Sequence, residues 1–237
     1  MDSEILLITV MSFVSGTVTA SLGFGAGLVL TPLLTFIMPV KQALAVSALV
    51  FLVTSASKAL IYRKDIDWLI YKKGLALAMI GLVIGGFSVS VVNPFWLEKF
   101  LGCALLYFAI NAVLKRDNMK SVIPTSLFPV MGGFMSIMTH AGGAFFFRYC
   151  RINNLGRIET VATLAGAHFT LNIFKAVFFT ATGFAASSYI YTLMPAYVSS
   201  VAGTYMGRHI LKNHMNEDLF VKGVAFVLIV MAIRFLT

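Results

Sequence analysis

The stretch that decides the fold is GTVTASLGFGAGLVLTPLLTFIM, residues 16–38, in which Gly23, Gly25 and Gly27 interrupt an apolar run that begins at Ile5. The arm after these glycines, Leu28–Met38, is apolar but short. A helix over it is about 16 Å long, which is half of a hydrocarbon core of about 30 Å. Such an arm does not span a bilayer. The stretch therefore predicts a re-entrant hairpin, or a broken helix, with its glycine tip inside a membrane.

A second stretch has the same organisation. Gly142 and Gly143 interrupt the apolar region Ile123–Phe147, with a long arm before them and a short arm after them. We expect Arg148 to interrupt this second short arm and to mark the cytoplasmic edge. The alternative is that Arg148 binds substrate. The chain thus contains two glycine-broken segments rather than one.

The composition requires a membrane as the solvent for much of the chain. Of the 237 residues, 59% are hydrophobic and 11% are charged, whereas soluble domains carry about 25% charged residues. The formal charge of +9 would suggest a nucleic-acid partner in a soluble protein. Here the basic residues lie in short loops between apolar runs, which is the positive-inside pattern. We therefore predict a lipid bilayer as the surroundings and exclude nucleic acid as a partner.

Six further apolar stretches, each about 20 residues long, predict spanning helices. They are Gln42–Tyr62, Lys73–Val91, Phe95–Leu114, Ile158–Ala181, Ser187–Met206 and Leu219–Phe235. The basic loops are placed inside, and loops poor in basic residues outside. This arrangement works if each glycine hairpin enters and leaves on one side. It predicts a multi-pass protein of the cytoplasmic membrane with both termini outside.

The two halves of the chain match at a constant shift of 117 residues. Gly16 falls on Gly133, and Gly25 falls on Gly142. Each half, 1–116 and 117–237, contains one hairpin and three spans, so the halves have opposite orientations in the membrane. The predicted fold class is an all-α polytopic membrane protein with two inverted-topology repeats, each a glycine-broken re-entrant hairpin plus three transmembrane helices. Inverted repeats with interrupted helices are typical of transporters that bind substrate near the midplane.

Two motifs resemble those of the sulfite exporter TauE/SafE family. The first is Gly23-Phe24-Gly25-Ala26-Gly27-Leu28 followed by Pro32, and the second is His140-Ala141-Gly142-Gly143. Ala26 replaces a glycine usual in the first motif, and Tyr149 stands where the second repeat usually has a proline. The resemblance covers essentially the whole chain. It implies a secondary transporter for sulfite, organosulfonates or related sulfur-containing anions.

An anion held at the midplane needs donors and positive potential, and helix N-termini supply both. Each glycine tip precedes a short helix, and glycine lets the backbone approach a ligand closely. Alternatively, the glycines only allow close helix packing. The candidate substrate-binding residues of the tips are Gly23, Phe24, Gly25, Ala26 and Gly27 in the first half and His140, Ala141, Gly142 and Gly143 in the second.

Polar side chains on two helices extend this candidate site. His168, Asn172 and Lys175 are spaced four and then three residues apart, so they share one helix face. Ser55 and Lys58 occupy the matching face in the first half. Charges in hydrocarbon are usually functional, and both lysines would attract an anion. The alternatives are lysines that reach the membrane edge and polar groups that only join helices.

Other functions are less well supported by the sequence. All acidic residues lie in or at the ends of loops, with Glu159 in the first turn of a helix, so a cation transporter is disfavoured. Cys103 and Cys150 match no metal or redox spacing. No metal, cofactor or enzymatic activity is predicted. A passive small-anion channel and a cation-coupled sulfonate uptake permease remain open, proton coupling would need His140 or His168, and a homodimer is possible.

Overall fold

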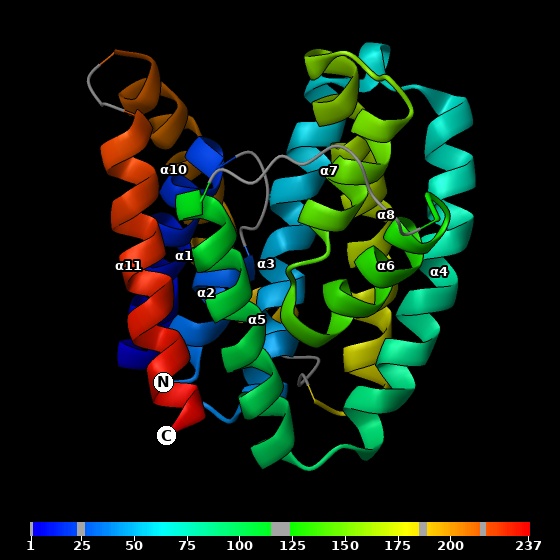
Figure 1. Cartoon of the computed structure of the whole chain (residues 1–237). Helices are drawn as coiled ribbons and strands as arrows, with labels where there is room; N and C mark the ends of the chain where they lie inside the picture. Colours follow the sequence, from blue (N-terminus) through cyan, green and yellow to red (C-terminus); the bar gives the residue numbers. More distant parts are fainter. Residues whose placement is uncertain (1, 23–26, 115–123, 185–188, 214–216) are drawn as a thin grey trace.

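The structure, a computed structural model, describes residues 2–22, 27–114, 124–184, 189–213 and 217–237 (Figure 1). These residues form helices, and no strand occurs among them. The first half contains α1 (Asp2–Leu22), α2 (Gly27–Leu34), α3 (Val40–Ile61), the 3₁₀ turn η1 (Arg63–Asp65), α4 (Trp68–Val91) and α5 (Pro94–Leu114). The second half contains α6 (Leu127–Thr139), α7 (Gly143–Ile152), α8 (Arg157–Ala181), α9 (Tyr189–Thr192), α10 (Met194–Asn213) and α11 (Glu217–Leu236). The prediction of an all-helical protein is confirmed.

Three helices of the described chain are long and apolar enough to cross a bilayer, namely α3, α4 and α8. They coincide with three of the predicted spans. The helices α5 and α11 also lie where spans are predicted. The span predicted over Ser187–Met206 is displaced, because the long helix α10 begins only at Met194. Pro195 follows directly, and the first turn is the part of a helix that tolerates proline.

The second short arm is longer than the sequence suggests. Helix α7 continues through Arg148 to Ile152, so the expectation that Arg148 interrupts it is wrong. The Arg148 guanidinium lies 5.1 Å from the ring centroid of Phe128 in α6. This cation–π contact gives the charge a partner while the backbone stays helical. At the end of α7, Asn153 Nδ2 donates to the Tyr149 carbonyl.

Acidic side chains begin two of the long helices. Asp67 precedes α4, and its Oδ1 accepts from the amides of Leu69 and Ile70. Glu159 lies in the first turn of α8, and its Oε2 accepts from the amide of Gly156 at 2.8 Å. Both carboxylates satisfy amides that a helix leaves unpaired at its start. The expectation that Glu159 is an ordinary first-turn acid is confirmed.

The largest helix contacts join the two halves of the chain. Helix α1 packs on α10, α4 on α6, α3 on α8, and α5 on α11. Figure 1 shows α1, α10 and α11 on one side of the molecule and α4, α6 and α8 on the other. Neither half therefore packs as a separate body, since each of these helix pairs takes one helix from each half of the chain.

The α4–α6 pair packs backbone against backbone at two glycines. A Cβ added to Gly81 would meet the Val130 carbonyl, and one added to Gly133 would meet the Ala78 carbonyl. Neither backbone group can move aside without disturbing its own helix. Glycine at both positions lets the two helices approach closely, as small residues do in membrane bundles.

The α1–α10 pair packs in the same way. A Cβ on Gly16 would meet the Ser200 carbonyl, and one on Gly203 would meet the Phe13 carbonyl. Gly16 and Gly133 are one of the pairs matched by the 117-residue shift, and each meets a backbone carbonyl of a helix in the other half of the chain.

Both termini lie at one end of the molecule, and the α3–α4 connection lies at the opposite end (Figure 1). This agrees with a threading in which the termini share a side and the basic loop at 63–73 faces the other. Which side faces the cytoplasm stays a prediction.

We predict that Gly133→Val destabilises the protein by about 1–3 kcal/mol, since the added side chain meets backbone that cannot move aside. Gly223→Ala is the control, because a Cβ there meets nothing within 4 Å. Unfolding free energies in SDS–detergent mixtures measure both. Equal stability of Gly133→Val and the wild type would contradict the close α4–α6 approach.

Candidate functional site

The second glycine tip lies where α6 turns back into α7. Helix α6 ends at Thr139, and His140 adopts a left-handed conformation with φ of 58°. Its amide donates to the Ser136 carbonyl at 3.1 Å. Left-handed backbone is uncommon outside glycine, although histidine is among the residues that adopt it more often. This turn reverses the chain, and Gly132 of α6 packs beside Phe145 of α7.

The ring of His140 is held from two sides. Its Nδ1 lies 2.9 Å from Lys175 Nζ, and its Nε2 lies 3.0 Å from the Leu44 carbonyl oxygen. An ammonium group only donates, so we assign Nδ1 as the acceptor and Nε2–H as the donor to Leu44. The ring of Phe51 packs edge-on against it, with centroids 5.4 Å apart. His140 therefore joins the α6–α7 tip to α3 and to α8.

Lys175 is the buried cation of this site. Its side chain is 2% exposed. Its Nζ donates to the Ser136 carbonyl at 3.2 Å and to His140 Nδ1. An ammonium carries three donors, and the described chain provides no acceptor for the third. No carboxylate of the described residues pairs with it, so its charge lacks a counter-ion within that part of the protein.

Asn172 lies on the same face of α8. Its Nδ2 donates to the Phe51 carbonyl at 3.2 Å and to Ser55 Oγ at 3.1 Å. Ser55 Oγ in turn donates to the Phe51 carbonyl at 2.6 Å. Asn172 and Ser55 are both buried. The stripe predicted on α8 thus meets the stripe predicted on α3, and the contact is a hydrogen bond between helices.

Two of the predicted site residues stay outside this network. Lys58 on α3 is partly buried, and no hydrogen bond or ion pair of its Nζ occurs among the described residues. His168 is also partly buried, and its ring makes no hydrogen bond within the same residues. The 117-residue shift pairs Lys58 with Lys175, and Lys175 contacts the second glycine tip through His140.

The tips themselves are described unequally. Ala141 is buried, and its amide donates to Thr139 Oγ1 at 3.3 Å. Gly142 precedes α7, and Gly143 is its first residue. In the first half, Gly27 begins α2. The predicted binding residues Gly23, Phe24, Gly25 and Ala26 lie outside the described residues.

Three groups of the site were not predicted. They are the carbonyl oxygens of Ser136 and Leu44 and the hydroxyl of Thr139. Ser136 lies four residues before His140, and that spacing could have placed it on the same face of α6. The Leu44 carbonyl has no signal in the sequence, because every residue carries one.

The cysteines and carboxylates form no metal site in the described chain, where no group of three or more His, Cys, Asp or Glu side chains could hold a metal ion. Cys103 is exposed and Cys150 is buried, and neither forms a disulfide. The chemistry of the site is thus that of a buried ammonium, an imidazole, an amide and hydroxyls. Such groups bind and orient an anion through N–H and O–H donors.

Comparison with known proteins identifies a matching family model and a similar protein. A family model described as "Sulfite exporter TauE/SafE" matches residues 8–235. A "Probable membrane transporter protein" from Haemophilus influenzae is 23% identical over 262 aligned residues, which cover 99% of this chain and 98% of the relative. No solved structure matches the chain.

We predict that Lys175→Met raises the free energy of unfolding by about 1–4 kcal/mol in the absence of added anions, because it removes a buried charge for which the described residues supply no counter-ion. Lys58→Met is the control: its partly exposed side chain makes a change of about 0.5 kcal/mol or less. Unfolding in SDS–detergent mixtures measures both. A Lys175→Met protein less stable than the wild type would show that the ammonium is compensated within the bundle.

Proposed function

The chain belongs to the sulfite exporter TauE/SafE family of membrane transporters, and from this premise we propose that it moves sulfite, an organosulfonate or a related sulfur-containing anion across the cytoplasmic membrane. The observation that supports this proposal is the buried ammonium of Lys175 beside His140. A buried cation without a counter-ion is costly, and in a transporter it marks the path of an ion of opposite charge.

The substrate anion binds at the turn between α6 and α7. There it accepts from the free N–H of Lys175 and from backbone amides at the start of α7, where Gly142 and Gly143 leave room for an oxyanion. His140 moves with the tip and keeps the ammonium oriented through Nδ1. The face of α3 that carries Ser55 and Lys58 and the α8 residues His168 and Asn172 line the approach.

An inverted repeat underlies this arrangement. Gly16 and Gly133, which the 117-residue shift matches, each meet a backbone carbonyl of a helix in the other half, and α3 of the first half packs on α8 of the second. Residues 1–116 and 117–237 form the two repeats. Alternating access then consists of one group of helices rocking against the other around the α3–α8 contact.

The membrane potential determines the direction in which an anion can be transported without a coupled ion. Moving one elementary charge across 100 mV is worth about 2.3 kcal/mol. A negative interior opposes anion entry and favours anion exit. Export therefore runs on the potential alone, while a sulfonate uptake permease would require a coupled cation.

We predict that the α3–α4 loop faces the cytoplasm and the C-terminus faces outward, as the positive-inside pattern indicates. Lys64→Cys and Thr237→Cys, each in a Cys103→Ser/Cys150→Ser background, are treated in intact cells with a membrane-impermeant maleimide. Thr237→Cys is expected to react at once, and Lys64→Cys only after the membrane is permeabilised. The reverse order of labelling would invert the proposed topology.

We predict that proteoliposomes carry sulfite or methanesulfonate outward when the interior is negative, and that Lys175→Gln lowers the rate roughly tenfold or more, since a hydrogen bond between charged groups is worth about 1.5–3 kcal/mol. Lys222→Gln, which changes an exposed lysine on α11, is the matched control.

Counterflow separates the candidate mechanisms in the same vesicles. A transporter exchanges labelled for unlabelled anion, whereas a passive channel gives flux without counterflow. A folded wild type that moves neither anion would refute the substrate class.

A further inference from the structure

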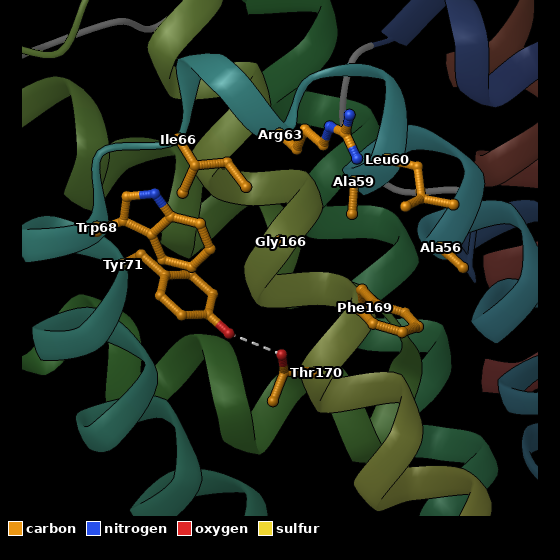
Figure 2. Close-up of a pocket in the computed structure, with 10 residues that line it drawn as sticks. All are labelled: Ala56, Ala59, Leu60, Arg63, Ile66, Trp68, Tyr71, Gly166, Phe169 and Thr170. Carbon is orange, nitrogen blue, oxygen red and sulfur yellow. Dashed lines mark hydrogen bonds between the residues drawn. The ribbon is translucent and has the colours of Figure 1, made fainter.

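A pocket of about 330 Å³ lies where α3, α4 and α8 meet, at the end of the molecule that carries η1 (Figure 2). Its lining is almost wholly apolar, and Arg63 supplies its one charge. Figure 2 shows Arg63 at one end of the pocket and the Tyr71–Thr170 hydrogen bond at the other. The pocket is separate from the His140–Lys175 site, which none of its residues touches through a hydrogen bond in the described chain.

The charged end of the pocket is free to bind an anion. The Arg63 side chain is exposed, and within the described residues no hydrogen bond or ion pair engages its guanidinium. The segment 63–73, which runs from η1 into the first turns of α4, carries four basic residues against two acidic ones. One of those acids, Asp67, already accepts from the first amides of α4. The end of the pocket thus presents net positive charge and a planar donor suited to a phosphate.

The lining residues at the opposite end of the pocket offer an anion no charged donor comparable to Arg63. Tyr71 OH and Thr170 Oγ1 pair with each other at 2.8 Å. Ile66, Phe169 and the alanines of α3 form the walls. A small hydrated anion such as sulfite would lose water there without gaining donors, so the deep part suits a hydrocarbon chain.

The mouth of the pocket opens on the surface that lipid covers. Leu60 is 67% exposed and Trp68 is 54% exposed, and both line the pocket. Trp68 and Tyr71 stack edge-to-face, 5.4 Å between ring centroids. Tryptophan and tyrosine gather at the depth of lipid headgroups, next to basic residues that attract anionic lipid.

We propose that this pocket binds an anionic phospholipid, with its phosphate on Arg63 and one acyl chain between α3, α4 and α8. The pocket is charged at the membrane edge and apolar toward the midplane. This matches a lipid, which has a charged headgroup and apolar acyl chains. The seated chain lies against Ala59 and Phe169, the chain neighbours of Lys58 and His168. It therefore packs on the same two helices, α3 and α8, that carry the candidate anion site. The proposal does not depend on which anion is transported.

The two tryptophans of the chain provide the test. Trp96→Phe leaves Trp68 in the pocket as the reporter, and Trp68→Phe leaves Trp96, exposed near the start of α5. The full-length variants are reconstituted with phosphatidylcholine and increasing fractions of phosphatidylglycerol whose acyl chains are brominated, which quenches nearby tryptophan fluorescence. We expect brominated phosphatidylglycerol to quench Trp68 about fivefold more effectively than brominated phosphatidylcholine, the preference that one basic contact supplies. Trp96 should be quenched equally by both.

The Arg63→Gln exchange in the Trp96→Phe background should remove the preference, and Arg63→Lys should retain part of it. Equal quenching of Trp68 by the two lipids, or a preference unchanged in Arg63→Gln, overturns the proposal. Displacement of the brominated lipid by millimolar methanesulfonate also overturns it, because the pocket would then accept a soluble anion. Failure of anion flux in the same vesicles, with the lipid preference intact, would refute only the proposed function.

Discussion

The candidate site is organised around the ammonium of Lys175, which is buried where α8 meets the end of α6. Its partners in the described chain are neutral, a carbonyl of Ser136 and the ring of His140. In hydrocarbon such a charge is expensive, and a packed protein that only needed stability would replace it with an apolar side chain. Under the proposed function, an anion that binds there transiently would account for its burial at a glycine tip. His140 links this charge to α3 through the Leu44 carbonyl, so the same proposal couples occupation of the site to the position of the tip.

The packing of the helices makes such coupling mechanically reasonable. In the pairs α1–α10 and α4–α6, glycines of one helix pack against the backbone of the other. The two helices of each pair therefore have little room to move relative to each other. In the contact between α3 and α8, Asn172 donates hydrogen bonds from α8 to Ser55 Oγ and to the Phe51 carbonyl of α3. Such bonds average about 0.6 kcal/mol in membrane proteins, so they can exchange partners at little cost. Rocking of two groups of helices requires tightly packed helix pairs that move as units. It also requires a polar contact between the groups that can rearrange.

Hydrophobic length predicted much of this fold, since a span of about 20 apolar residues has few alternatives in a bilayer. The positions of α3, α4 and α8 follow from it, and Asn172 and Lys175 share the face that helical spacing predicted. Tertiary contacts escaped prediction. In the sequence, Arg148 indicates the end of a helix. In the structure, its guanidinium lies against the Phe128 ring and α7 continues past it. Lys58 and Lys175 look equivalent in sequence, yet only the second half has a histidine at its tip, with glycine at the matching position 23. Carbonyl partners such as Leu44 leave no trace in a side-chain pattern.

Direct binding tests most simply whether Lys175 is paired by a transported anion. Radiolabelled sulfite is titrated into the purified protein in detergent, for the wild type and for Lys175→Met. The account predicts saturable binding to the wild type that Lys175→Met abolishes while the variant stays folded. Binding of equal affinity in both proteins would contradict it, because the buried ammonium would then have no part in holding the anion.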